Sequence, residues 1–238
     1  MGNQMVFKRY EMKYLMTRCQ KNTILAAMKP YMVLDEYGYS SSRNIYFDTP
    51  DFRLIRQSLE KPVYKEKLRM RSYGRAGTGD KTFVELKKKY KSIVYKRRLS
   101  LPQAQAEACL NGKLALPDTQ IGGEIAYALD YYRELRPAVF LSYEREAFCA
   151  RDGGDFRVTF DENILYRQEE LTLDSEVWGM PILSSNQVLM ELKTSGGIPL
   201  WMAHTLSTQK IFQTSFSKYG TAYQKILLTE QKGARKYA

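Results

Sequence analysis

The sequence predicts an α+β fold in which about eight antiparallel strands close into a barrel with peripheral helices. Three observations predict it. Short runs with alternating apolar and charged residues recur along the 238-residue chain. Segments with helical periodicity lie between these runs. No repeat, low-complexity linker or sharp shift in composition marks a boundary, so we expect a single domain over residues 1–238.

The strand predictions rest on alternation, bounded by turn-forming residues. In the run Lys-Glu-Lys-Leu-Arg-Met-Arg, which begins at Lys65, basic and apolar side chains alternate over several positions. The other runs have the same alternating character. In chain order, we expect strands at about residues 5–13, 42–48, 63–73, 82–88, 93–99, 138–149, 155–161 and 187–193.

The helix predictions rest on capping residues and on proline at helix starts. Thr17 is a candidate N-cap, and Pro50 precedes a second helical segment. In chain order, we expect helices at about residues 19–29, 51–59, 103–110, 124–135, 199–207 and 218–229.

Composition restricts the partners and the location. The 37 Lys and Arg residues against 26 Asp and Glu give a formal charge of +11, which favours anionic partners: nucleic acid, anionic lipid or phosphate compounds. No apolar run approaches the roughly 20 residues of a membrane span, and the first residues lack the apolar stretch of a signal peptide. The three cysteines are scattered without a Cys-x-x-Cys spacing. We therefore expect a cytoplasmic protein without a membrane span.

Nearly every expected strand carries a charged set on one face, because side chains two positions apart point the same way. A half-buried sheet would explain any one strand taken alone. Together the strands argue otherwise, because neighbouring cationic faces repel unless they converge on an anion. An enclosed basic channel that binds phosphate would satisfy them. The sets that share a face are Glu11 with Lys13; Lys65, Lys67, Arg69 and Arg71; Glu85 with Lys87; Lys96 with Arg98; Arg157, Thr159 and Asp161; and Glu191 with Lys193.

Missing motifs exclude several kinds of site. The only histidine is His204, in an expected helix, which excludes His-based triads and multi-His metal sites. Neither a P-loop nor a Gly-x-Gly-x-x-Gly motif occurs, so phosphate would be bound by side chains. Carboxylates at Glu11 and Glu191 could hold a divalent cation or pair with a neighbouring cation. For Glu11 the ion pair is the better interpretation.

Several ordered motifs carry a resemblance over nearly the whole chain. They are RYEMKY, SSRNIYFDTPDF, KLRMRSYG, TFVELK, VYKRRLSL, SYEREAF, FRVTFDENI, LMELK and FSKYGTAY. With these motifs the chain resembles the catalytic domain of the vacuolar transporter chaperone (VTC) family of polyphosphate polymerases, a branch of the triphosphate tunnel metalloenzymes. The resemblance implies a free-standing domain of the bacterial type.

The resemblance also implies an activity and its residues. The reaction would transfer the terminal phosphoryl of ATP to a growing inorganic polyphosphate, with ATP, polyphosphate or triphosphate as partners and no nucleic acid. Glu191 would hold Mn²⁺ or Mg²⁺. Catalytic phosphate clamps would be Arg69, Arg71, Lys87, Arg145 and Arg157, and further substrate contacts would be Lys13, Lys67, Lys96, Arg98, Lys193 and Lys218.

Two departures from family patterns leave alternatives open. Ser215 stands where the eukaryotic polymerase has the first lysine of Lys-Phe-Ser-Lys, which removes one cation. Hydrolytic tunnel enzymes, which act on tripolyphosphate or thiamine triphosphate, begin with Glu-x-Glu-x-Lys, whereas Arg9 occupies the first of those positions here. That substitution favours the polymerase branch but leaves hydrolysis open. A non-catalytic protein that binds polyphosphate or RNA is the third alternative, since 18 tyrosines could stack on bases.

Overall fold

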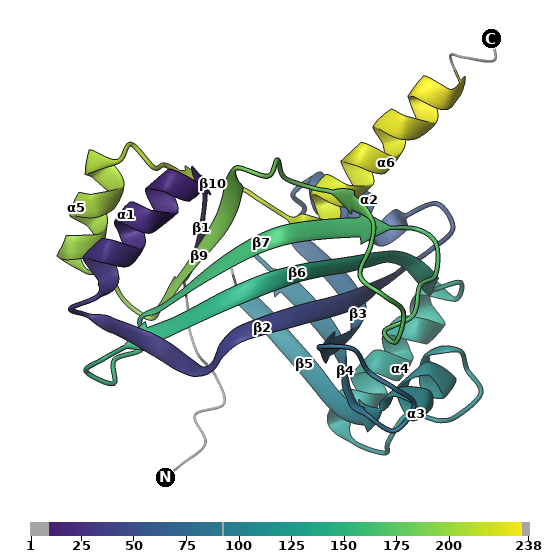
Figure 1. Cartoon of the computed structure of the whole chain (residues 1–238). Helices are drawn as coiled ribbons and strands as arrows, with labels where there is room; N and C mark the ends of the chain where they lie inside the picture. The colour runs from purple at the N-terminus through teal and green to yellow at the C-terminus, as the bar shows by residue number, and fades with distance from the viewer. Residues whose placement is uncertain (1–9, 92, 235–238) are drawn as a thin grey trace. The chain divides into compact units, whose positions relative to one another are not determined.

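A computed structural model of the chain describes residues 10–91 and 93–234 (Figure 1). The chain folds into two compact units, which we describe separately. The first unit comprises Met1–Ser41, Tyr143–Ile164 and Leu183–Phe216, and the second comprises Ser42–Ser142, Leu165–Ile182 and Ser217–Ala238. The prediction of one domain over residues 1–238 stays a prediction.

The described residues form ten strands and six helices, so the predicted α+β class is confirmed. The strands form one sheet in the order β10-β1-β9-β7-β6-β2-β3-β4-β5, with β8 paired to β7. Within the described part of the chain, the end strands β10 (Gln213–Thr214) and β5 (Ile93–Pro102) do not pair with each other. A closed barrel is therefore not confirmed. Strand β10 is only two residues long, so it offers few backbone groups for closure.

In the first unit, the apolar faces of three strands pack beneath two helices. Val188, Met190 and Leu192 are fully buried against Ile24 of one helix and Met202 of the other. Because these residues alternate along their strand, Glu191, between Met190 and Leu192, lies on the opposite face. The elements involved are β1 (Tyr10–Thr17), β7 (Arg157–Arg167), β9 (Gln187–Thr194), α1 (Arg18–Met28) and α5 (Leu200–Thr208).

The start of α1 confirms the predicted cap. The hydroxyl of Thr17 accepts a hydrogen bond from the Gln20 backbone nitrogen at 3.2 Å, and the Gln20 side chain accepts one from the Thr17 backbone nitrogen at 2.9 Å. This reciprocal capping box satisfies two backbone donors that the first helical turn leaves unpaired.

In the second unit, a second apolar face packs against helices. Ile45, Met70 and Val84 lie side by side across neighbouring strands and pack with Ala106 and Ile125. The strands are β2 (Met32–Asp48), β3 (Tyr64–Tyr73), β4 (Lys81–Tyr90), β5, β6 (Arg136–Ala150) and β8 (Met180–Pro181), of which β2 and β6 also enter the first unit. The helices are α2 (Arg53–Leu59), α3 (Gln103–Leu110), α4 (Gln120–Tyr132) and α6 (Lys218–Ala234).

A buried carboxylate joins three elements of the second unit. Asp48, at the end of β2, accepts hydrogen bonds from the backbone nitrogens of Leu54 at 2.8 Å and Ile55 at 3.1 Å, and from the Tyr219 hydroxyl at 2.8 Å. Burial raises the pKa of Asp48, although these hydrogen bonds oppose the shift. Burial, together with the charge of Asp48, raises the pKa of Tyr219. The first turn of α6 is thereby fixed against β2 and α2.

We expect Tyr219→Phe to lower the free energy of unfolding by about 1–3 kcal/mol, because a buried carboxylate loses one of its donors. Urea unfolding at neutral pH measures the change. Tyr127→Phe, which removes the hydroxyl of an exposed tyrosine on α4, serves as the control. Equal stabilities for the two variants would show that the hydrogen bond to Asp48 contributes nothing.

The predicted elements match the structure unevenly. All six predicted helices are present; α4 begins earlier than expected, at Gln120, with Thr119 as its N-cap. Residues 32–41 of β2 and the short strands β8 and β10 were not predicted. Residues 5–9 of the first predicted strand lie outside the described residues.

Candidate functional site

In the second unit, one sheet face carries three lysines in a row. Lys67 of β3 lies directly opposite Lys87 of β4, which lies directly opposite Lys96 of β5. Like charges in this arrangement destabilise a sheet. The row therefore requires nearby negative charge, either from the protein or from a bound anion.

The adjacent row supplies only one negative charge. It consists of Tyr46, Arg69, Glu85 and Arg98, again directly opposite one another. The Glu85 side chain is 2% exposed and lies at the centre of three cations. Arg69 donates through Nε at 2.7 Å, Arg98 through Nε at 2.7 Å, and Lys96 lies with Nζ at 2.8 Å.

Glu85 is held ionised by these neighbours. Burial alone would raise the pKa of its carboxyl, but the charges of Arg69, Arg71 and Lys96 outweigh burial and hold the pKa well below its usual range. Three cations thus share one carboxylate, and the face keeps excess positive charge. Such a preformed set of Arg and Lys donors is suited to phosphate oxygens.

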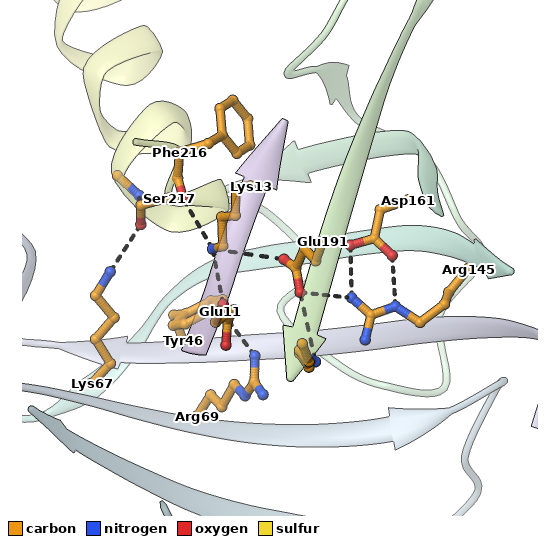
Figure 2. Close-up of polar contacts among 12 residues, drawn as sticks. Glu11, Lys13, Tyr46, Lys67, Arg69, Arg145, Asp161, Glu191, Phe216 and Ser217 are labelled. Carbon is orange, nitrogen blue, oxygen red and sulfur yellow. Dashed lines mark hydrogen bonds and ion pairs between the residues drawn. The ribbon is translucent and has the colours of Figure 1, made fainter. Parts of the chain in front are cut away.

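Polar side chains hold two further cations of this unit. Arg71, 5% exposed, donates through Nε to the Asn44 side-chain oxygen at 2.7 Å. Lys67 donates to the Ser217 hydroxyl at 2.9 Å (Figure 2). The same hydroxyl accepts a hydrogen bond from the Gly220 backbone nitrogen at 3.1 Å. Lys218, the first residue of α6, is half-buried beside this contact.

In the first unit, the polar face of β1, β9 and β7 carries two rows. One row consists of Lys13, Glu191 and Thr159, and the other of Glu11, Lys193 and Arg157. In each row the residue of β9 lies between residues of its two neighbouring strands. Both rows lie opposite the apolar face that packs against α1 and α5.

Glu191 is a nearly buried carboxylate among three cations, and is 5% exposed. Figure 2 shows Lys13 and Arg145 on two sides of it. Its Oε1 lies 3.6 Å from Lys13 Nζ, and its Oε2 lies 3.6 Å from Arg145 NH2 and 3.8 Å from Lys193 Nζ. Lys13 is in turn held by the Phe216 carbonyl, to which its Nζ donates at 3.0 Å. These ion-pair distances exceed those of charge-assisted hydrogen bonds.

Arg145 is fixed by a two-point contact with Asp161. Its Nε and NH2 lie 2.6 and 2.7 Å from the two Asp161 oxygens, and the Asp161 side chain is fully buried. Burial lowers the pKa of Arg145, but the charge of Asp161 outweighs it and raises the pKa overall. In the described part of the chain, Arg145 NH1 makes no hydrogen bond, so this nitrogen can donate to a ligand.

Comparison with known proteins identifies the family. The VTC domain family matches residues 8–227. The chain belongs to the VTC domain family. The resemblance found in the sequence motifs is thereby confirmed, and the match covers both units of this VTC domain.

Solved structures show the same fold at low identity. A candidate adenylate cyclase from Bacillus halodurans is 18% identical with a TM-score of 0.54, covering 87% of this chain and 92% of that one. A candidate adenylyl cyclase from Hippeastrum, in which a triphosphatase activity is dominant, is 15% identical with a TM-score of 0.58, covering 90% and 95%. No curated protein matches the chain. Within residues 10–91 and 93–234, no helix of this VTC domain is long and apolar enough to cross a membrane.

The oxygen donors of this VTC domain fit a divalent cation that is shared between the protein and a bound phosphate compound. In the ranges that the structure describes, no three His, Cys, Asp or Glu side chains are grouped so as to hold a metal ion. Glu191 offers a carboxylate surrounded by cations. Magnesium is typically held by one or two carboxylates plus substrate phosphates. The donor set therefore fits a hard cation that takes its remaining oxygens from a bound phosphate compound, and the assignment of this cation to Glu191 stays a prediction.

The predicted site residues fall into two sets, and their roles stay predictions. The first unit holds Lys13, Arg145, Arg157, Glu191 and Lys193. The second unit holds Lys67, Arg69, Arg71, Lys87, Lys96, Arg98 and Lys218. Sequence reasoning assigned no role to Glu85 or Asp161, which are buried carboxylates that position arginines. Glu85 shares a strand face with Lys87, and Asp161 shares one with Thr159, so the alternation does mark them as polar-face residues. The arginines that they hold belong to other strands, which the alternation does not identify.

Proposed function

We propose that this VTC domain is a phosphotransferase that moves the terminal phosphoryl of ATP onto a growing inorganic polyphosphate. The observation that supports it best is the row of Lys67, Lys87 and Lys96 beside the Arg69 and Arg98 pair, with one buried carboxylate among them. Phosphoryl transfer needs positioning and neutralisation of spread negative charge more than covalent chemistry. Preformed cations provide both.

The arginines and lysines would act differently. The planar guanidinium of Arg69, Arg71, Arg145 or Arg157 suits two-point contact with phosphate oxygens. The lysines add point charges along the chain of phosphates. Lys218 begins α6, and Lys67 donates to Ser217 just before that helix, so both would hold the phosphates near its start.

A closed tunnel of the kind that the family resemblance implies belongs to this proposal. The polyphosphate product is a chain with a negative charge on each phosphate, so a single substrate can contact many cations along its length.

Glu191 would hold the divalent cation, Mn²⁺ or Mg²⁺. When bound, the cation would neutralise charge on the phosphate oxygens and draw electrons from the transferred phosphoryl group. Lys13 and Lys193 flank Glu191 within 3.8 Å and would keep it oriented while they contact neighbouring phosphates.

Hydrolysis of tripolyphosphate or a nucleoside triphosphate is the second candidate. The observation that favours it is the fold shared with the Hippeastrum protein, in which a triphosphatase activity is dominant. Both reactions need the same phosphate clamps, and they differ in whether a phosphate chain or water accepts the phosphoryl group.

Product analysis tests the proposal. We expect purified protein with ATP and Mn²⁺ to yield ADP and a long anionic polymer, which polyacrylamide gels separate and an exopolyphosphatase digests. Orthophosphate without polymer would support hydrolysis. If neither product forms, and tripolyphosphate fails to compete with tightly bound RNA, the protein is a nucleic-acid-binding protein and both enzymatic proposals fail.

A further inference from the structure

Thr159 carries a buried hydroxyl on the polar face of the first unit. This residue of β7 is 8% exposed, and in the part of the chain that the structure describes its Oγ1 makes no hydrogen bond. Leaving a buried polar group unsatisfied costs about 1–3 kcal/mol. Valine would fill the same strand position without that cost. A hydroxyl at this position therefore suggests a ligand that completes its bonding.

The position of Thr159 indicates which ligand. Thr159 lies directly opposite Glu191 in the β7–β9 pair. Side chains in such pairs share one face, with Cβ atoms about 4.5–5.5 Å apart. Both residues are nearly buried, so their side-chain oxygens are neighbours on this face with little access to solvent.

The other oxygen donors of this face are already engaged. Arg145 holds both oxygens of Asp161. Glu11 lies 3.4 Å from Lys13 in an ion pair and is exposed. The remaining neighbours, Lys13 and Lys193, are cations that repel a metal ion. Thr159 offers a neutral oxygen beside Glu191, and threonine hydroxyls ligate Mg²⁺ in other phosphate sites.

We propose that the Thr159 hydroxyl and the Glu191 carboxylate together form the protein part of a divalent-metal site. This inference rests on the proposed function, because substrate phosphates would supply the remaining ligands. It adds a second protein ligand from a neighbouring strand, which fixes the cation between β7 and β9.

The inference is tested by measuring Mn²⁺ binding to the full chain, without nucleotide, by electron paramagnetic resonance. We expect Thr159→Val to weaken Mn²⁺ binding on the order of tenfold and Thr159→Ser, which keeps a hydroxyl, to bind nearly as the natural protein does. Thr194→Val removes a buried hydroxyl from the opposite face of β9 and should leave Mn²⁺ binding unchanged. Thermal unfolding of each variant checks that it is folded.

Two further measurements separate the possible failures. Unchanged Mn²⁺ binding in Thr159→Val, with binding lost in Glu191→Gln, overturns the role of Thr159 and leaves the proposed function standing. If Glu191→Gln still binds Mn²⁺ as the natural protein does, the assignment of the cation to Glu191 in the proposed function is wrong. The Thr159 hydroxyl could instead contact phosphate directly, which calorimetry of tripolyphosphate binding in EDTA tests. If Thr159→Val lowers this metal-free affinity and leaves Mn²⁺ binding unchanged, the hydroxyl contacts phosphate and the metal assignment is wrong.

Discussion

An Arg145→Ala variant is expected to lose at least about a hundredfold in the turnover of ATP, because a clamp on the developing phosphoryl charge is removed. Arg145 is anchored to Asp161 through two nitrogens, and its NH2 lies 3.6 Å from Glu191. The anchoring leaves NH1 as a rigid donor beside the expected metal carboxylate. Steady-state kinetics of ADP release measures the loss.

Two variants separate this role from a structural one. Arg145→Ala removes the two-point partner of the buried Asp161 carboxylate, which can cost about 3–5 kcal/mol of stability. Arg145→Lys keeps the charge but loses the planar fork, so we expect it to fold and still lose turnover more than it loses substrate affinity. Arg151→Ala, an exposed arginine just after β6, removes the same charge and is the control. Full turnover in Arg145→Lys would contradict the clamp.

Strand faces were predictable because side-chain alternation is a local property of the sequence. The apolar residues Met70 of β3 and Val84 of β4 turn to the core, as the alternation predicts. Their charged neighbours Arg69 and Glu85 lie on the opposite face. The capping box at Thr17 was predictable for the same reason, since all its atoms come from four consecutive residues.

The partners of the site residues were not predictable in this way. The carboxylate of Glu85 holds Arg69 from one neighbouring strand and Arg98 from the other, so its role depends on the register of two strand pairs. Asp161 likewise holds Arg145 of a different strand. Strands β8 and β10 are two residues long and carry no alternation that a sequence pattern could reveal.

We expect Glu85→Gln to lower the free energy of unfolding by about 3–5 kcal/mol at neutral pH, because it leaves three cations without their shared carboxylate. Urea unfolding measures the change. Glu134→Gln, at an exposed position of the same unit, removes one negative charge and is the control. A loss no larger than that of the control would show that Glu85 does not hold the cations together.

The pH dependence of this effect has a definite sign. The pKa of Glu85 is lower in the folded protein than the ordinary value of 4.5, so the folded state binds this proton less readily than the unfolded state. Its contribution to stability is therefore complete above the unfolded pKa and is lost as pH falls from about 4.5 towards the folded pKa. The difference between the natural protein and Glu85→Gln should shrink over this range. A difference that grows with acidity would contradict the ionised carboxylate.

The same variant connects stability with the proposed ligand. Without the Glu85 charge, Arg69, Lys96 and Arg98 repel one another, and a bound polyphosphate would replace the missing negative charge. Added tripolyphosphate should therefore raise the unfolding temperature of Glu85→Gln by more than it raises that of the natural protein, through preferential binding to the folded state. An equal or smaller rise would mean that the anion binds elsewhere, and the lysine row with its neighbouring arginines would then lose its assigned role.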